Sequence, residues 1–121
     1  VDRVVSLVPD LEVCGDESGD VLLVGWGGTY GHMLSTLREL RQEGKNVSLA
    51  HFNYIMPLPS NVNEVFSRFK KIIVCELNLG QFASYLRDKV PGFTYHQYNK
   101  VQGLPFTVKE LKSAVTKLLE E

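Results

Sequence analysis

The sequence contains a glycine-rich stretch, Gly25-Trp-Gly-Gly-Thr-Tyr-Gly31, directly after the apolar run Val21–Val24. A turn of this kind between a strand and a helix can bind an anion through its backbone N–H groups, and Thr29 could add a hydroxyl. The spacing G-x-G-x-x-x-G is one residue longer than the dinucleotide fingerprint, whose third glycine would fall at Tyr30. No acidic residue ends the next strand, and no Lys-Ser/Thr pair follows the glycines. We therefore expect neither a dinucleotide site nor a Walker loop, and we favour a packing role for the glycines over anion binding.

Polar side chains follow two further predicted strands. Glu76, Asn78 and Gln81 come after one of them, and His51 lies at the end of the other. Because the carboxyl ends of parallel strands meet at one edge of a sheet, these side chains should lie beside the glycine turn and could bind a small molecule. Alternatively, Asn78 and Gln81 cap the following helix, and His51 is a hydrogen-bonded structural histidine. None of these residues is expected to be catalytic. The candidate binding or interdomain-contact residues are Gly27, Gly28, Thr29, Tyr30, Gly31, His51, Glu76, Asn78 and Gln81.

The composition restricts the classes of partner. A net charge of −1 and a pI near 6.3 offer no basic surface, so we expect no binding to nucleic acid. No apolar run is long enough to span a bilayer, and no signal peptide is visible, so we expect a cytoplasmic protein without membrane contact. The histidines and cysteines form no metal-spaced cluster. We favour free thiols at Cys14 and Cys75, with a disulfide between them as the alternative.

Apolar periodicity predicts strands that alternate with helices. Strands are expected at 11–14, 21–25, 47–52, 71–75 and 93–98, and helices at 30–43, at 61–69, after 81 and after 107. This order predicts a three-layer α/β/α domain with a mostly parallel sheet. Residues 11–14 and 21–24 could pair as an antiparallel hairpin.

Local signals support these boundaries. Gly44 suits the position after a helix, Ser60 could cap the short helix, and Thr107-x-x-Glu110 has the form of a capping box. Residues 1–10 resemble an interdomain linker because Pro9 breaks any helix there. We expect one domain over 11–121, as a fragment of a longer subunit.

Five motifs follow one another along the chain: Gly25–Gly31, Leu40–Gly44, His51 with Pro57-Leu58-Pro59, Glu76–Gln81 and Asn99–Phe106. Together, in this order, they resemble the C-terminal domain of the alpha subunit of 2-oxoacid:ferredoxin oxidoreductases, with the 2-oxoglutarate enzymes most similar. The resemblance covers the chain from about Leu11 to its end. The family has Gly-Ser-Thr-Tyr-Gly where this chain has Gly-Gly-Thr-Tyr-Gly, so the serine hydroxyl is missing at Gly28.

The resemblance implies a fold like the transketolase C-terminal domain, with the first strand antiparallel to the others. It implies that the whole enzyme uses thiamine diphosphate, CoA and an iron–sulfur cluster to convert a 2-oxo acid to acyl-CoA and CO2 while reducing ferredoxin. In the family, an upstream pyrimidine-binding domain and the beta subunit build the thiamine site. The resemblance therefore implies a noncatalytic domain without a cofactor of its own, which shapes subunit contacts. A small-molecule or anion-binding regulatory domain is the alternative.

Overall fold

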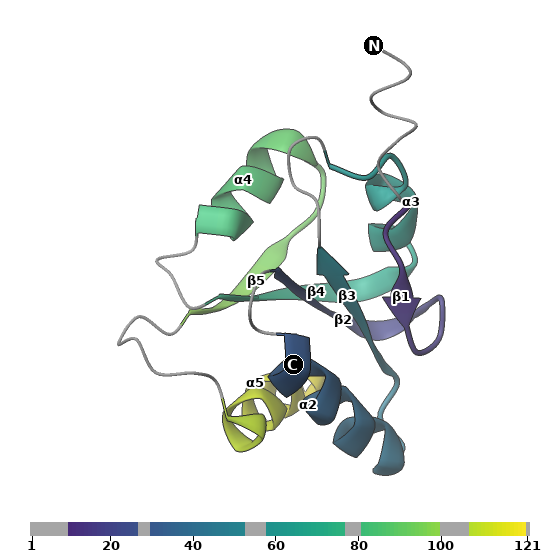
Figure 1. Cartoon of the computed structure of the whole chain (residues 1–121), viewed down its shortest axis with the longest axis vertical. Helices are drawn as coiled ribbons and strands as arrows, with labels where there is room; N and C mark the ends of the chain where they lie inside the picture. The colour runs from purple at the N-terminus through teal and green to yellow at the C-terminus, as the bar shows by residue number, and fades with distance from the viewer. Residues whose placement is uncertain (1–9, 27–29, 53–57, 77–80, 100–106, 121) are drawn as a thin grey trace.

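The computed structural model describes residues 10–26, 30–52, 58–76, 81–99 and 107–120. Within them a five-stranded sheet has the order β1-β3-β2-β4-β5, and every neighbouring pair is parallel except β1 with β3. Helices α2 and α5 cover one face, and α3 and α4 cover the other (Figure 1). The three-layer α/β/α prediction is confirmed. The elements are β1 (Val13–Cys14), β2 (Gly19–Trp26), α2 (Tyr30–Gln42), β3 (Val47–Phe52), α3 (Val62–Phe66), β4 (Phe69–Glu76), α4 (Gln81–Lys89), β5 (Tyr95–Asn99) and α5 (Val108–Glu120).

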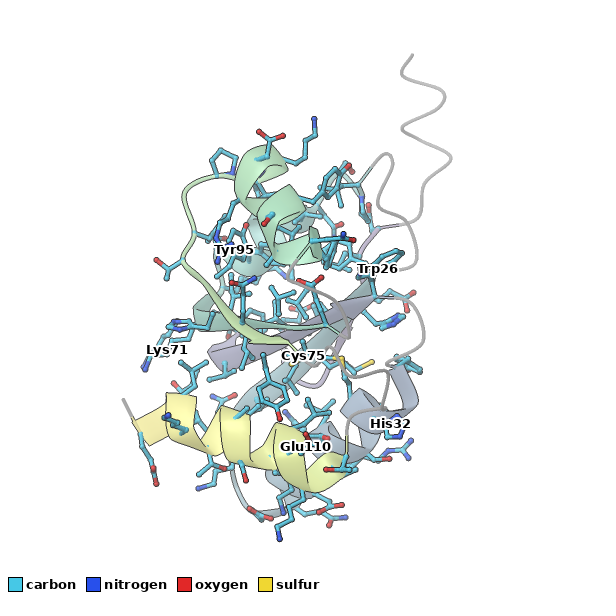
Figure 2. The ribbon with its side chains drawn as sticks, turned by 90° about the vertical axis from the view of Figure 1, so that its left-hand side faces the viewer. Trp26, His32, Lys71, Cys75, Tyr95 and Glu110 are labelled. Carbon is cyan, nitrogen blue, oxygen red and sulfur yellow. The ribbon has the colours of Figure 1, made fainter. Side chains whose placement is uncertain are left out.

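Two apolar clusters lie on opposite faces of the sheet. Alternate residues of the central strands point to opposite sides, so Leu22 and Val24 belong to one cluster while Val21 and Leu23 belong to the other. All four are fully buried, as expected of a strand covered on both faces. Figure 2 shows Tyr95 on the side of α4 and Glu110 on α5 across the sheet. The sheet is thus the middle layer between two separate cores.

The predicted hairpin between residues 11–14 and 21–24 is wrong. β1 pairs with β3 instead, with Val13 opposite Ala50 and Cys14 opposite Leu49. β1 cannot pair with β2, because β3 and β4 already occupy both hydrogen-bonding edges of β2. The expected antiparallel orientation of the first strand is confirmed, but its partner depends on the neighbours of β2.

The turn between β1 and β2 is tied to β3 and α2. The buried hydroxyl of Ser48 donates to the carbonyl oxygen of Asp16 at 2.7 Å. The guanidinium of Arg41 donates to the carbonyl of Val47 at 3.1 Å and lies 3.5 Å from the Asp16 carboxylate. These contacts hold the turn against β3 and place β1 on its outer side.

We expect Gly15→Ala to destabilise the protein more than Gly44→Ala. Both glycines have positive φ, +108° and +83°, so alanine at either position strains the backbone by about 1–2 kcal/mol. A Cβ at Gly15 would also lie 2.9 Å from the Ser48 hydroxyl, whereas none of the described atoms lies within 4 Å at Gly44. Urea unfolding should therefore show an additional loss of about 1–3 kcal/mol for Gly15→Ala. Equal losses would mean that the turn moves freely away from Ser48.

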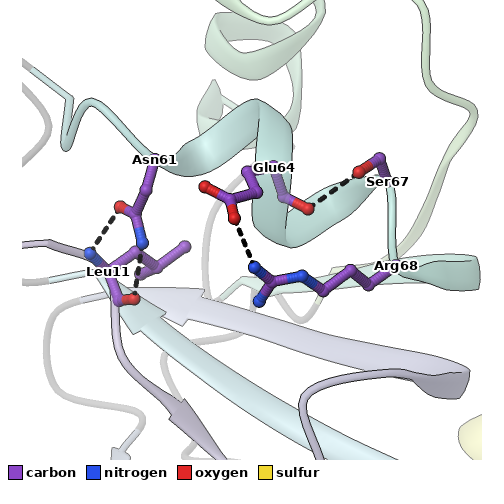
Figure 3. A network of polar contacts seen from close by, with 5 residues as sticks. All are labelled: Leu11, Asn61, Glu64, Ser67 and Arg68. Carbon is purple, nitrogen blue, oxygen red and sulfur yellow. Dashed lines mark hydrogen bonds and ion pairs between the residues drawn. The ribbon is translucent and has the colours of Figure 1, made fainter.

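The segment around α3 differs from its prediction (Figure 3). Helix α3 is only five residues long, and Phe69 begins β4 instead of extending the helix. The residue before the helix is Asn61, not Ser60. The Asn61 amide accepts from the backbone N–H of Leu11 at 2.7 Å and donates to its carbonyl at 3.0 Å. A side chain far along the sequence thus fixes the chain just before β1.

Two local predictions are confirmed. The hydroxyl of Thr107 accepts from the backbone N–H of Glu110 at 3.1 Å, and the Glu110 carboxylate accepts from the backbone N–H of Thr107 at 3.2 Å. Gly44 follows α2 with positive φ, and the N–H of Lys45 donates to the carbonyl of Leu40 at 3.0 Å. Both signals depend only on neighbouring residues.

Cys14 and Cys75 are free thiols, which excludes the disulfide alternative. Cys14 lies on β1 and Cys75 on β4, with β3 and β2 between them. Neighbouring strands lie about 4.8 Å apart, so β1 and β4, three strand spacings from each other, are separated by roughly 14 Å. A disulfide requires Cα atoms within about 7 Å.

Candidate functional site

The carboxyl edge of the parallel strands is where sequence analysis placed the candidate site. Trp26, Phe52 and Glu76 end the three central strands there, and helices α2 and α4 begin at Tyr30 and Gln81. The structure brings several of the predicted residues to this edge. Gly27, Gly28, Thr29 and Asn78 lie outside the described residues.

Glu76 is the best-defined polar residue of this edge, and it serves the fold. Its side chain is 2% exposed. One carboxylate oxygen accepts from the backbone N–H of Phe82 at 2.7 Å, and the other accepts from that of Ala83 at 2.9 Å. These N–H groups belong to the first turn of α4, where helices leave their donors unsatisfied and favour negative charge. Glu76 therefore caps the start of α4, the role that the sequence suggested for Asn78 and Gln81.

The position of Glu76 bears directly on anion binding. The start of a helix attracts an anion through the same N–H groups and the same dipole that Glu76 occupies here. Those two donors of α4 are already bonded within the chain, while the Gln81 side chain lies exposed at the start of the helix. An anion-binding site between residues 76 and 81 therefore loses its strongest physical support.

Two exposed aromatic residues flank the glycine turn. Trp26 is 38% exposed and Tyr30 is 41% exposed. The Trp26 ring lies 5.8 Å from the ring of Phe82, and the Tyr30 ring lies edge-on to His51 at 5.0 Å, both measured between ring centroids. Trp26 was missed as a site residue, although a lone tryptophan among glycines was a usable signal. The described part of this edge is aromatic and partly exposed.

Tyr30 also contacts the first strand. The Cys14 thiol lies next to the Tyr30 phenol, and the charge of its thiolate form is the main cause that raises the pKa of Tyr30. The phenol therefore stays neutral at physiological pH. A Cβ at Gly31 would meet none of the described atoms within 4 Å, so the predicted close packing at this glycine finds no support there.

Cys75 should resist thiol reagents in the folded protein. Burial, followed by the charge of Glu76, raises the pKa of the Cys75 thiol from 9.0 to about 12. At pH 8 it is protonated and shielded, and a thiolate is needed for reaction. We expect a thiol-disulfide dye to label at most one cysteine until denaturant is added, and Cys14→Ser to abolish labelling of the native chain. Rapid native labelling of the Cys14→Ser variant would contradict this placement.

The same shift gives stability a dependence on pH. The folded state keeps the Cys75 proton at pH values where the unfolded chain, with its pKa near 9.0, loses it. The stabilising contribution of the neutral thiol is complete below pH 9.0 and is lost as the pH rises toward about 12.

The described residues contain no group of three or more His, Cys, Asp or Glu that could hold a metal ion. Among the described helices, none combines the length and apolar character that a membrane span requires. Hollows lined by described residues lie away from the carboxyl edge: one between β5 and α5, another along α5 beside α2, and another at the amino ends of β2 and β4.

The chain has close relatives among characterised proteins, although no family model matches it. The 2-oxoglutarate oxidoreductase subunit KorA of Mycobacterium tuberculosis is 42% identical over 106 residues, which is 86% of this chain and 16% of that protein. The alpha subunit of 2-oxoacid:ferredoxin oxidoreductase 1 of Aeropyrum pernix is 40% identical over 106 residues, 84% of this chain and 16% of that protein. The chain therefore spans about one sixth of the length of these relatives.

Solved structures of other enzymes have the same fold as this chain. The 2-oxoglutarate:ferredoxin oxidoreductase of Magnetococcus marinus, solved with 2-oxoglutarate, coenzyme A and succinyl-CoA bound, matches with a TM-score of 0.90 and 26% identity. The match covers 98% of this chain and 21% of that one. A split-gene transketolase, at 16% identity, shares the fold with a TM-score of 0.67 over 90% of this chain and 41% of that one. The chain is thus a domain-sized homologue of the alpha subunits of 2-oxoacid:ferredoxin oxidoreductases.

Proposed function

We propose that this chain is a noncatalytic domain of the alpha subunit of a thiamine-diphosphate-dependent 2-oxoacid:ferredoxin oxidoreductase, with 2-oxoglutarate as the favoured substrate. The whole enzyme converts the 2-oxo acid and CoA to acyl-CoA and CO2 and passes the electrons to ferredoxin through an iron–sulfur cluster. Residues 11–121 form the domain, and residues 1–10 link it to an upstream pyrimidine-binding domain. The parent enzyme works in the cytoplasm together with a beta subunit.

One observation supports the noncatalytic assignment: at the carboxyl edge of the sheet, backbone donors that could bind a ligand are already bonded to Glu76. Ligands of open α/β sheets bind at this edge, commonly at the start of a helix. Here Glu76 occupies two donors at the start of α4, and the neighbouring described surface includes the exposed aromatic side chains of Trp26 and Tyr30 beside Gln81. Half-exposed aromatic residues of this kind are typical of surfaces that another protein unit covers. The edge is therefore suited to contact with a neighbouring domain or subunit.

Calorimetry tests the cofactor assignment. Titration of this chain with thiamine diphosphate and Mg²⁺ should show no heat of binding, and the chain should not reduce a dye with 2-oxoglutarate and CoA. Tight binding of thiamine diphosphate to the chain alone would place a cofactor site within it and overturn the proposal.

The contact surface is tested in the full-length parent subunit co-expressed with its beta subunit. A Trp26→Ser and Tyr30→Ser double variant should lose most of the assembled complex on gel filtration, because aromatic anchors dominate the binding energy of interfaces. Lys70→Ser is the matched control, since its side chain is 81% exposed at the opposite end of β4. Unchanged assembly of the aromatic variant, with native thermal stability, would remove this edge from the interface.

A further inference from the structure

The outer edge of the sheet offers a second interaction surface, which does not depend on the proposed function. We infer that the outer edge of β5, together with α5, docks an extended acidic segment of a partner protein as an added strand. Strand addition to an open sheet edge is a recurrent mode of protein recognition, in which backbone hydrogen bonds give affinity and side-chain pockets give specificity.

β5 is the better of the two sheet edges for such pairing. In the described structure it pairs with β4 alone, in parallel, and no described strand lies on its other side. β1 forms the opposite edge but is only two residues long, and a short edge strand is a poor template. β5 is five residues long, which is enough to pair with an extended segment.

Alternate residues of β5 belong to opposite faces. Tyr95 and Gln97 lie on the α4 side, where the guanidinium of Arg87 donates to the Tyr95 carbonyl at 3.1 Å and to the Gln97 side chain at 3.2 Å. His96 and Tyr98 lie on the α5 side, and the Tyr98 hydroxyl donates to the Glu110 carboxylate at 2.9 Å. A strand added beside β5 would place every second side chain on the α5 side too.

A hollow of about 590 Å³ lies on that side, between β5 and α5. Ile73, Ala114 and Leu118 give it an apolar floor. The exposed side chains of Lys109 and Lys117 lie along its rim. Its wall is therefore apolar at the base and cationic at the top.

The two rim lysines are available for a partner. Neither Lys109 nor Lys117 forms an ion pair with any of the described residues, whereas Lys112 on the same helix is paired with Glu39 of α2 and with Glu43 just after it. The one carboxylate of the hollow, that of Glu110, is bonded to Tyr98 and to Thr107. The rim thus presents unpaired positive charge, which favours an acidic partner.

The spacing of the lysines specifies the segment. Eight residues separate them, which is about 12 Å along a helix that rises 1.5 Å per residue. Carboxylates four residues apart on a strand lie about 13 Å apart, and the residue midway between them faces the same side. The geometry therefore fits acid-x-apolar-x-acid, with the middle side chain on the apolar floor. A second copy of this chain does not fit, because its β5, Tyr95–Asn99, carries no carboxylate.

The probe is a blocked heptapeptide, Thr-Glu-Thr-Val-Thr-Glu-Thr, titrated into the isotope-labelled chain and followed by amide NMR shifts. We expect the amides of β5 to shift, and affinity to fall about tenfold in the Lys109→Glu and Lys117→Glu double variant, since two attractive pairs become repulsive. Lys45→Glu should bind as the wild type does, since Lys45 is exposed and lies before β3, away from the hollow. Thermal unfolding checks that all variants are folded.

Three results would overturn the inference. The first is an absence of β5 shifts at saturating peptide. The second is an equal response to inorganic phosphate, which would indicate anion binding by the lysines without strand pairing. The third is peptide-independent self-association through β5 in sedimentation experiments, which would assign the edge to a second copy of the chain.

Discussion

Replacing Glu76 by alanine should lower the free energy of unfolding by about 2–4 kcal/mol, because two buried backbone donors of α4 lose their acceptor. The carboxylate is 2% exposed and bonds the N–H groups of Phe82 and Ala83 at 2.7 and 2.9 Å. Water cannot easily replace it at this depth. Urea unfolding with an unchanged m-value is the appropriate measurement, since it separates lost stability from an altered denatured state.

Glu64 provides the matched control for Glu76. Its carboxylate pairs with Arg68, two residues beyond the end of α3, but its side chain is 68% exposed. Exposed pairs of this kind contribute about 0–1 kcal/mol, so Glu64→Ala should change stability little. If both alanine variants lost the same small amount, the capping role of Glu76 would be refuted. The thiamine diphosphate test would be unaffected by that result.

Phe66→Ala should be the most destabilising substitution in the core, with a loss of about 3–5 kcal/mol. Phe66 is fully buried on α3, and its ring lies 6.2, 5.7 and 5.9 Å from the rings of Phe52, Phe93 and Tyr95. Removing it leaves a cavity between α3 and the strands, because Phe52 is fixed on β3 while Tyr95 begins β5 and Phe93 lies just before it, so the rings cannot all move inward. Phe66 is the largest of the three buried side chains of α3, the others being Val62 and Val65.

Phe93→Ala tests whether burial or ring contact dominates this effect. Phe93 contacts both Phe66 and Tyr95, but it is only half-buried at the start of the β5 segment. Water can fill part of the space it leaves, so we expect a loss of about 1–2 kcal/mol. Chemical denaturation of both variants should rank Phe66 well above Phe93. The reverse order would show that β5, not α3, depends most on this cluster.

Much of the fold follows from local patterns. The strand Val47–Phe52 has the predicted bounds, and α2 begins at Tyr30 as expected and ends at Gln42, within a residue of the prediction. The sequence also predicts the capping box at Thr107 and the helix-terminating role of Gly44, which has positive φ. Each of these features depends on residues a few positions apart, where side-chain periodicity and backbone preference act directly.

The candidate site was predicted less completely. Tyr30, His51, Glu76 and Gln81 were all located from the rule that strand ends gather at one edge. The structural roles of these residues could not be predicted from the sequence. The hydrogen-bond acceptor for the start of α4 is Glu76 at the end of β4, and not a residue next to the helix. The exposure of Trp26 likewise depends on which elements cover the end of β2.

The sequence by itself thus determined the alternation of strands and helices, the buried faces of the central strands and the family resemblance, since all of these are carried by local spacing. Only the tertiary structure decided that β1 pairs with β3, that Asn61 fixes Leu11, and that Glu76 caps α4. The physical reason is the same in each case. A backbone or side-chain group is satisfied by whichever partner packing brings within hydrogen-bond distance, and these partners come from elements that only the folded sheet sets side by side.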